Sequence, residues 1–255
     1  MSEAWMPGVG HLRAAADGGH LNGGAPRAVW QALGADPGAV SAMSAAQRLC
    51  ELGRASHLVW NPVSGEIIQL VSVLRAGRCL GAPENLVSWG PAAADGTDGG
   101  WPMPAPAPAG PPAVTNFEGR VCAQICVVAW PWEPFTDGPL NGLETIMAWL
   151  DSWGVARTWP AGRPAAFPHG HAAGGSRRLW ARGGHFGASQ VPGWHAAGPG
   201  QIDIERLSGQ PAPAPALVSR VRPREASRPA DGLAVLDGLL GSAGATPAAS
   251  LTPVP

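Results

Sequence analysis

The residues best suited to chemistry gather in one stretch, "GGHFGASQVPGWHAAGPGQIDI", residues 183–204. It holds His185, Ser189, His195 and Asp203 between tight Gly and Pro turns. Imidazole and carboxylate groups bind zinc, and a serine with histidine and aspartate suggests a nucleophile. However, the His185, His195 and Asp203 spacing fits no strong metal motif, and the stretch has no G-x-S-x-G elbow. The alternative is a purely structural role, in which these histidines are hydrogen-bonded and pack the wall of a groove.

Thiols and a second histidine pair offer weaker chemistry. His169 and His171 have His-x-His spacing, but two ligands alone make a weak surface site. Cys126 could act as a ligand or nucleophile only beside a cationic group that lowers its pKa. The cysteines lack paired metal spacing and are predicted to be reduced core thiols: Cys50, Cys79, Cys122 and Cys126.

The elements that must position these residues follow from apolar periodicity. The pattern predicts strands at 27–30, 57–60, 66–73 and 121–130, and helices within 39–53 and 141–154. Asn141 and Glu144 have the spacing of a helix capping box. This order predicts a single α/β domain over residues 26–207. An irregular segment (1–25) precedes it, a Pro/Gly-rich insertion (82–119) interrupts it, and a Pro/Ala-rich linker and tail (208–255) follow.

Composition limits the partners. The formal net charge is −1 and all 17 basic residues are Arg, so electrostatics favour neither nucleic acid nor an acidic membrane surface. The chain opens without a basic and apolar leader and has no apolar run of about 18 residues. We therefore expect a soluble protein, cytoplasmic by default unless a partner exports it.

Four segments together resemble the zinc-dependent N-acetylmuramoyl-L-alanine amidases of the peptidoglycan-recognition-protein-like type, found in actinobacteria and their phages. They are "SHLVWNPVSGEIIQLV", "PFTDGPLNGLETIMAWLDSWGVARTWPAGRP", "LWARGGHFGASQVP" and "GPGQIDIERL". The resemblance covers most of residues 27–207. It implies a mixed sheet flanked by helices, with a groove that holds a muramyl peptide. It also implies a zinc-activated water that cleaves the amide between N-acetylmuramic acid and L-Ala.

The positions that match the family's zinc ligands are all substituted in this chain. Gln31 stands in place of the first His, Ala188 in place of the second His and Gly198 in place of the acid. Cys126 replaces a Glu on the neighbouring strand. Ala and Gly have no donor atom, and a Gln amide oxygen is a poor zinc ligand beside imidazole. The resemblance therefore implies the scaffold of a zinc site without the metal, so we expect no cofactor.

The function expected from this pattern is a degenerate amidase-like protein, a pseudo-enzyme that binds muramyl-peptide fragments of peptidoglycan without hydrolysis. Two alternatives stay open: an active amidase with an unorthodox or differently aligned ligand set, and a decayed relic. The expected partner is peptidoglycan, not nucleic acid or membrane. The expected groove residues are His57, His185, Ser189, Trp194 and His195, with Trp194 the best exposed aromatic for stacking on a sugar ring.

Overall fold

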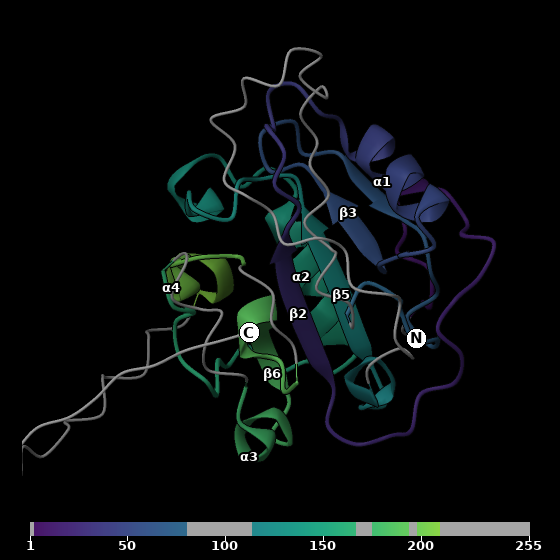
Figure 1. Ribbon diagram of the computed structural model, residues 1–255, viewed down its shortest axis with the longest axis vertical. Coiled ribbons are helices and arrows are strands. Elements are labelled where there is room, and N and C mark those ends of the chain that lie inside the picture. The colour runs from purple at the N-terminus through teal and green to yellow at the C-terminus, as the bar shows by residue number, and fades with distance from the viewer. Residues whose placement is uncertain (1–2, 81–113, 167–174, 194–197, 210–255) are drawn as a thin grey trace, which may run out of the picture. The chain divides into compact units, whose positions relative to one another are not determined.

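The computed structural model describes residues 3–80, 114–166, 175–193 and 198–209. A six-stranded sheet with strand order β1-β4-β3-β5-β2-β6 forms the centre of this part of the chain (Figure 1). Strands β3 and β4 are antiparallel, and every other neighbouring pair is parallel. The strands are β1 (Gly10–His11), β2 (Arg27–Ala32), β3 (Leu58–Trp60), β4 (Ile67–Gln69), β5 (Cys122–Val127) and β6 (Gly184–Gly187). The predicted α/β class and mixed sheet are confirmed.

Strand β2 lies between β5 and β6, and its register decides which residues of distant segments meet. Gln31 lies opposite Cys126 on β5, and Trp30 lies opposite Gly187 on β6. Every residue of β2, β5 and β6 is buried. Such burial is typical of parallel strands that are covered on both faces.

The two longer helices cover opposite faces of the sheet (Figure 1). Helix α2 (Leu143–Ser152) packs against a cluster that contains Trp30 and Ile125. Helix α1 (Ala42–Glu51) packs against a cluster that contains Val59 and Cys126. Because Gln31 pairs with Cys126 and side chains alternate along a strand, Gln31 also faces the α1 side.

Both predicted helices are present, but the predicted capping box of α2 is wrong. The N-cap is Gly142 in the left-handed conformation, with φ of 85°, and it makes no side-chain cap. The amide of Asn141 instead donates to the Val63 carbonyl at 2.7 Å. A Cβ at position 142 would lie 3.1 Å from the Gly65 carbonyl oxygen, so both the turn and the close approach favour glycine there.

The amino-terminal segment, expected to be irregular, takes part in the sheet. Strand β1 pairs with β4, and Met6 is fully buried in the α2-side cluster. The Gln69 side chain accepts a hydrogen bond from Met6 N at 2.6 Å and donates to the Ala4 carbonyl at 3.0 Å. All described residues fall in one unit, which therefore begins before the predicted boundary at residue 26.

The remaining described helices are short: η2 (Val114–Phe117), η3 (Phe135–Asp137), α3 (Arg177–Trp180), η5 (Ala188–Gln190) and α4 (Ile204–Ser208). None of the helices that the structure describes is long and apolar enough to cross a membrane. Most of the predicted 82–119 insertion and nearly all of the 208–255 tail lie outside the described residues.

Candidate functional site

The resemblance to the amidases implies zinc ligands at positions 31, 188 and 198, and these three positions lie at the carboxyl ends of β2 and β6. Gln31 and Ala188 directly follow Trp30 and Gly187, which lie opposite each other on these parallel strands. The Gly198 carbonyl accepts a hydrogen bond from Ser189 N at 2.9 Å. A Cβ at position 198 would lie 3.5 Å from the Ala32 nitrogen. Segments that are far apart in the sequence therefore come together at one edge of the sheet. We call the place where Gln31, Ala188 and Gly198 lie the convergence.

Close backbone contacts hold the turn Gly198–Gly200 at this edge. The Gly198–Pro199 peptide bond is cis. A Cβ at Gly187 would lie 2.8 Å from Pro199 Cδ, and one at Gly200 would lie 2.5 Å from the Pro131 carbonyl oxygen. Position 187 and position 200 thus need glycine, because a side chain on either would force its neighbour to move.

Asp203 anchors the segment that follows this turn. Its carboxylate caps α4 by accepting hydrogen bonds from Glu205 N and Arg206 N, each at 3.0 Å. Asp203 N in turn donates to Thr136 Oγ1 at 2.8 Å. The Asp203 carboxylate therefore acts as the N-cap of α4.

The donor atoms at the convergence do not fit zinc. Ala188 is fully buried in an apolar cluster with Val29 and Phe186, and Gly198 has no side chain. Gln31 is only 5% exposed, and its Oε1 has no hydrogen-bond partner among the described residues. One amide oxygen falls short of the three or more donors that a zinc site needs. Within the described ranges, no group of three or more His, Cys, Asp or Glu could hold a metal ion.

Cys126 lies opposite Gln31 but is a buried thiol. It is fully buried in the α1-side cluster and hydrogen-bonds the thiol of Cys79. This hydrogen bond, together with burial, holds the pKa of Cys79 well above its usual value. A neutral thiol in an apolar environment is a poor nucleophile and metal ligand. The pair therefore behaves as core, as the sequence predicted for the cysteines.

His57 braces two strands. It is fully buried, and its Nδ1 accepts a hydrogen bond from Gln124 N at 3.0 Å. Its Nε2 lies 2.8 Å from the Arg75 carbonyl, so the ring proton is on Nε2. Burial lowers the pKa of His57 to about 4. Both ring nitrogens are already engaged, which leaves no ring nitrogen to bind a ligand.

His185 lies on the other face of the sheet from Gln31. It pairs with Ala28, a member of the α2-side cluster, and its ring stacks between Trp30 and Trp159. Its Nδ1 accepts from Trp30 Nε1 at 3.0 Å, and burial lowers its pKa to about 4. The structure thus separates His185 from the convergence by the thickness of the sheet.

Of the expected groove residues, the structure brings Ser189 to the convergence. Ser189 is 7% exposed and lies in η5, the turn that follows β6. Gln190 fixes this turn, because its Oε1 accepts from Gly187 N at 2.9 Å and its Nε2 donates to the Gly162 carbonyl at 2.9 Å. Trp194 and His195 lie outside the described residues, as do His169 and His171.

A pocket that the sequence did not single out opens beyond the carboxyl ends of β3 and β5. Its volume is about 330 Å³, and Trp130, Glu133 and Asp137 contribute to its lining. The indole of Trp132 stacks on that of Trp130, with centroids 4.8 Å apart. The sequence feature that could have indicated this pocket is the "WPWEP" run, residues 130–134, directly after the central strand.

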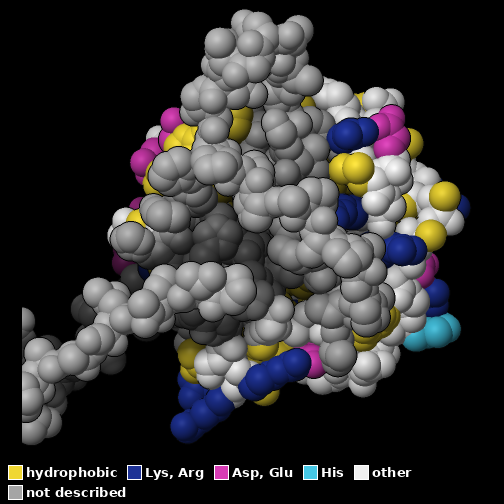
Figure 2. All heavy atoms as spheres, viewed as in Figure 1, with side chains coloured by type: hydrophobic (Ala, Val, Ile, Leu, Met, Phe, Trp, Pro, Cys, Tyr) yellow, Lys and Arg dark blue, Asp and Glu magenta, His cyan; other side chains and the backbone are white. Residues whose placement is uncertain are grey.

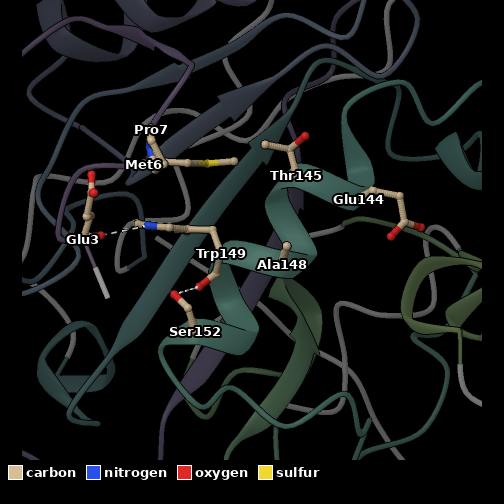
Figure 3. Close-up of a pocket in the computed structure, with 8 residues that line it drawn as sticks. All are labelled: Glu3, Met6, Pro7, Glu144, Thr145, Ala148, Trp149 and Ser152. Carbon is tan, nitrogen blue, oxygen red and sulfur yellow. Dashed lines mark hydrogen bonds between the residues drawn. The ribbon is translucent and has the colours of Figure 1, made fainter. Parts of the chain in front are cut away.

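A larger cavity, of about 570 Å³, lies between the amino-terminal segment and α2 (Figure 3). Its lining includes Met6, Trp149 and Glu144, and Trp149 Nε1 donates to the Glu3 carbonyl at 3.0 Å. Because α2 covers the face opposite Gln31, this cavity is separate from the convergence.

Comparison with protein-family models, curated proteins and solved structures finds no match to this chain. Fold and geometry define an α/β protein with a mixed six-stranded sheet. Its candidate site lies at the carboxyl edge of the parallel strands, where ligands bind in open α/β sheets.

Proposed function

We propose that this protein is a degenerate relative of the zinc-dependent amidases that binds muramyl-peptide fragments of peptidoglycan without hydrolysing them. One observation carries the proposal. Gln31, Ala188 and Gly198, which match the family's three zinc ligands, converge at the ends of β2 and β6. Their proximity supports the residue assignment on which the proposal rests.

The proposed lack of hydrolysis rests on the donor atoms at these positions. Amide hydrolysis at neutral pH needs an activated water, which this family obtains from a metal held by three protein ligands. Here the three positions supply one amide oxygen between them. Asp203, a nearby carboxylate, caps α4, and Cys126 is a buried thiol. Among the described residues, no group of three or more His, Cys, Asp or Glu could hold a replacement metal ion.

Binding is supported by the unpaired oxygen of Gln31. A buried amide carbonyl without a partner costs about 1–3 kcal/mol. Because Gln31 Oε1 is buried, a peptide N–H would reach it only after the side chain turned toward the surface, and that hydrogen bond would then recover part of this cost. The position of Gln31 at the carboxyl edge of the sheet, next to Ser189, suits a ligand that lies across this edge.

Sedimentation with insoluble peptidoglycan tests both halves of the proposal. We expect the full chain to be retained in the pellet, with no muropeptide released and less than one tenth of a zinc ion per chain. Absence of retention would remove the binding function. Stoichiometric zinc with release of muropeptides would instead show an active amidase.

Restoring the ligands tests the residue assignment. We expect the triple variant Gln31→His, Ala188→His, Gly198→Asp to bind about one zinc ion per chain and to gain lytic activity. Position 198 has room, because a Cβ there meets only ordinary contacts of 3.5 Å or more. Ala188 is tightly packed, so circular dichroism and zinc content must be measured beside activity. A folded triple variant that binds no zinc would refute the assignment.

A further inference from the structure

The pocket beyond β3 and β5 has an aromatic and proline-rich wall. Trp130 and Phe135 line it together with four prolines: Pro37, Pro62, Pro134 and Pro139. Trp132 stacks on Trp130 at an interplanar angle of 20° and is 52% exposed. An exposed indole that extends a pocket wall is a feature of binding surfaces.

The charged side chains that line the pocket are all acidic. Glu133 and Asp137 contribute carboxylates to the lining, and the lining contains no Arg, Lys or His. In the described part of the chain, neither carboxylate forms an ion pair. Other acids of this chain do have such partners, as Asp17 has with Arg75 and Asp151 with Arg157. Figure 2 shows acidic and hydrophobic side chains side by side at the upper left, where the segment around η3 lies in Figure 1.

We propose that this pocket binds the guanidinium group of an arginine side chain on a peptide. A guanidinium is planar and stacks on an indole face, while its N–H groups donate to carboxylates. Trp130 supplies the face, Glu133 and Asp137 supply the acceptors, and the prolines enclose the aliphatic stem. A cavity of about 330 Å³ has room for one such side chain.

This inference goes beyond the proposed function, because the pocket is lined by none of the residues Gln31, Ala188 and Gly198. It needs neither peptidoglycan nor zinc, so it can be tested by itself. Retention on peptidoglycan and binding of arginine are separate measurements, and either can fail alone.

The test is an NMR titration of the full chain with ¹⁵N-labelled tryptophan. Signals of Trp130 and Trp132 are assigned with the variants Trp130→Phe and Trp132→Phe. N-acetyl-arginine amide is compared with N-acetyl-citrulline amide, which has nearly the same shape without the charge. We expect saturable shifts of the Trp130 signal with arginine and at least a tenfold weaker response with citrulline.

Charge variants give the matched control. The double variant Glu133→Gln, Asp137→Asn should bind N-acetyl-arginine amide roughly threefold to tenfold more weakly. Glu144→Gln on α2, outside this pocket, should leave the affinity unchanged. Equal responses to arginine and citrulline would overturn the proposal. So would a stronger response to chito-oligosaccharides than to arginine, which would assign the indoles to a sugar.

Discussion

The Nδ1 atom of His185 lies 3.0 Å from the indole nitrogen of Trp30, and both side chains are fully buried. Because the indole N–H can only donate, Nδ1 must be unprotonated and the neutral ring carries its proton on Nε2. Within the described residues, that Nε2 has no acceptor. The ring is therefore held neutral between two tryptophans.

The free energy of unfolding should decrease as the pH falls, because the folded chain keeps the rings of His185 and His57 neutral. The pKa values of His185 and His57 are about 4 in the folded chain, against 6.5 when exposed. Their contribution is complete above pH 6.5 and is lost progressively down to pH 4. The loss amounts to about 3 kcal/mol for each ring. Urea unfolding between pH 7.5 and 4.5 measures it, and a flat free energy of unfolding over this range would contradict it.

The contribution of the Asp17 carboxylate to stability can be distinguished from this loss, because the two are lost over different pH ranges. A hydrogen bond from Arg75 is the main cause that lowers the pKa of Asp17 below its usual 3.8. A low folded-state pKa favours folding while Asp17 is ionised, so this contribution disappears only at lower pH than the histidine contribution. The Asp17→Asn variant should keep the decline between pH 6.5 and 4.

A pair of glycine variants tests the packing of the turn at the convergence. Gly187→Ala should reduce the free energy of unfolding by about 1–3 kcal/mol, because its Cβ would lie 2.8 Å from Pro164 Cγ and from Pro199 Cδ. Gly198→Ala should change it by less than about 0.5 kcal/mol, because its contacts are of ordinary length. Chemical denaturation of both variants checks the contrast, which equal losses would refute.

Gln31→Met should separate stability from binding. The apolar side chain removes an unpaired buried oxygen, so we expect the free energy of unfolding to stay equal or to rise by about 1–2 kcal/mol. Retention on peptidoglycan should decrease at the same time, because a ligand loses its acceptor. Gln47→Met, at an exposed position of α1, is the matched control. A variant that is less stable and binds equally well would show that Gln31 has a structural role.

A zinc chelator should leave the thermal stability of the protein unchanged. Since the convergence offers a single amide oxygen, we expect the same melting temperature with and without a zinc chelator. Differential scanning calorimetry at two chelator concentrations measures this. A drop in the melting temperature of more than about 2 °C would indicate a bound metal.

Local sequence patterns predicted four of the six strands of the sheet and both longer helices, but not β1 or β6. The apolar run around Cys126 became the central strand β5, and the stripe of Leu143, Ile146 and Leu150 became the buried side of α2. These patterns depend on residues close in the chain, whose periodicity directly reflects burial. The start of α2 was predicted wrongly because Asn141 bonds Val63, which belongs to another segment.

The candidate site was predictable only in part, since it depends on strand register. His57 and His185 attract attention as chemical groups, yet their partners Gln124 and Trp30 lie 67 and 155 residues away in the sequence. No local pattern reveals such partners. The pocket at Trp130 was missed for a related reason, because the prolines of its wall come from three separate segments of the chain.

Pro131 joins the two regions at the carboxyl edge. It lies between the pocket residues Trp130 and Glu133, and its carbonyl packs directly against Gly200 in the turn beside Ser189. If a ligand shifted the Trp130 segment, this contact would be the place where the shift could reach the turn beside Ser189. Binding at one place would then change affinity at the other, and thermodynamic linkage requires the effect to be equal in both directions.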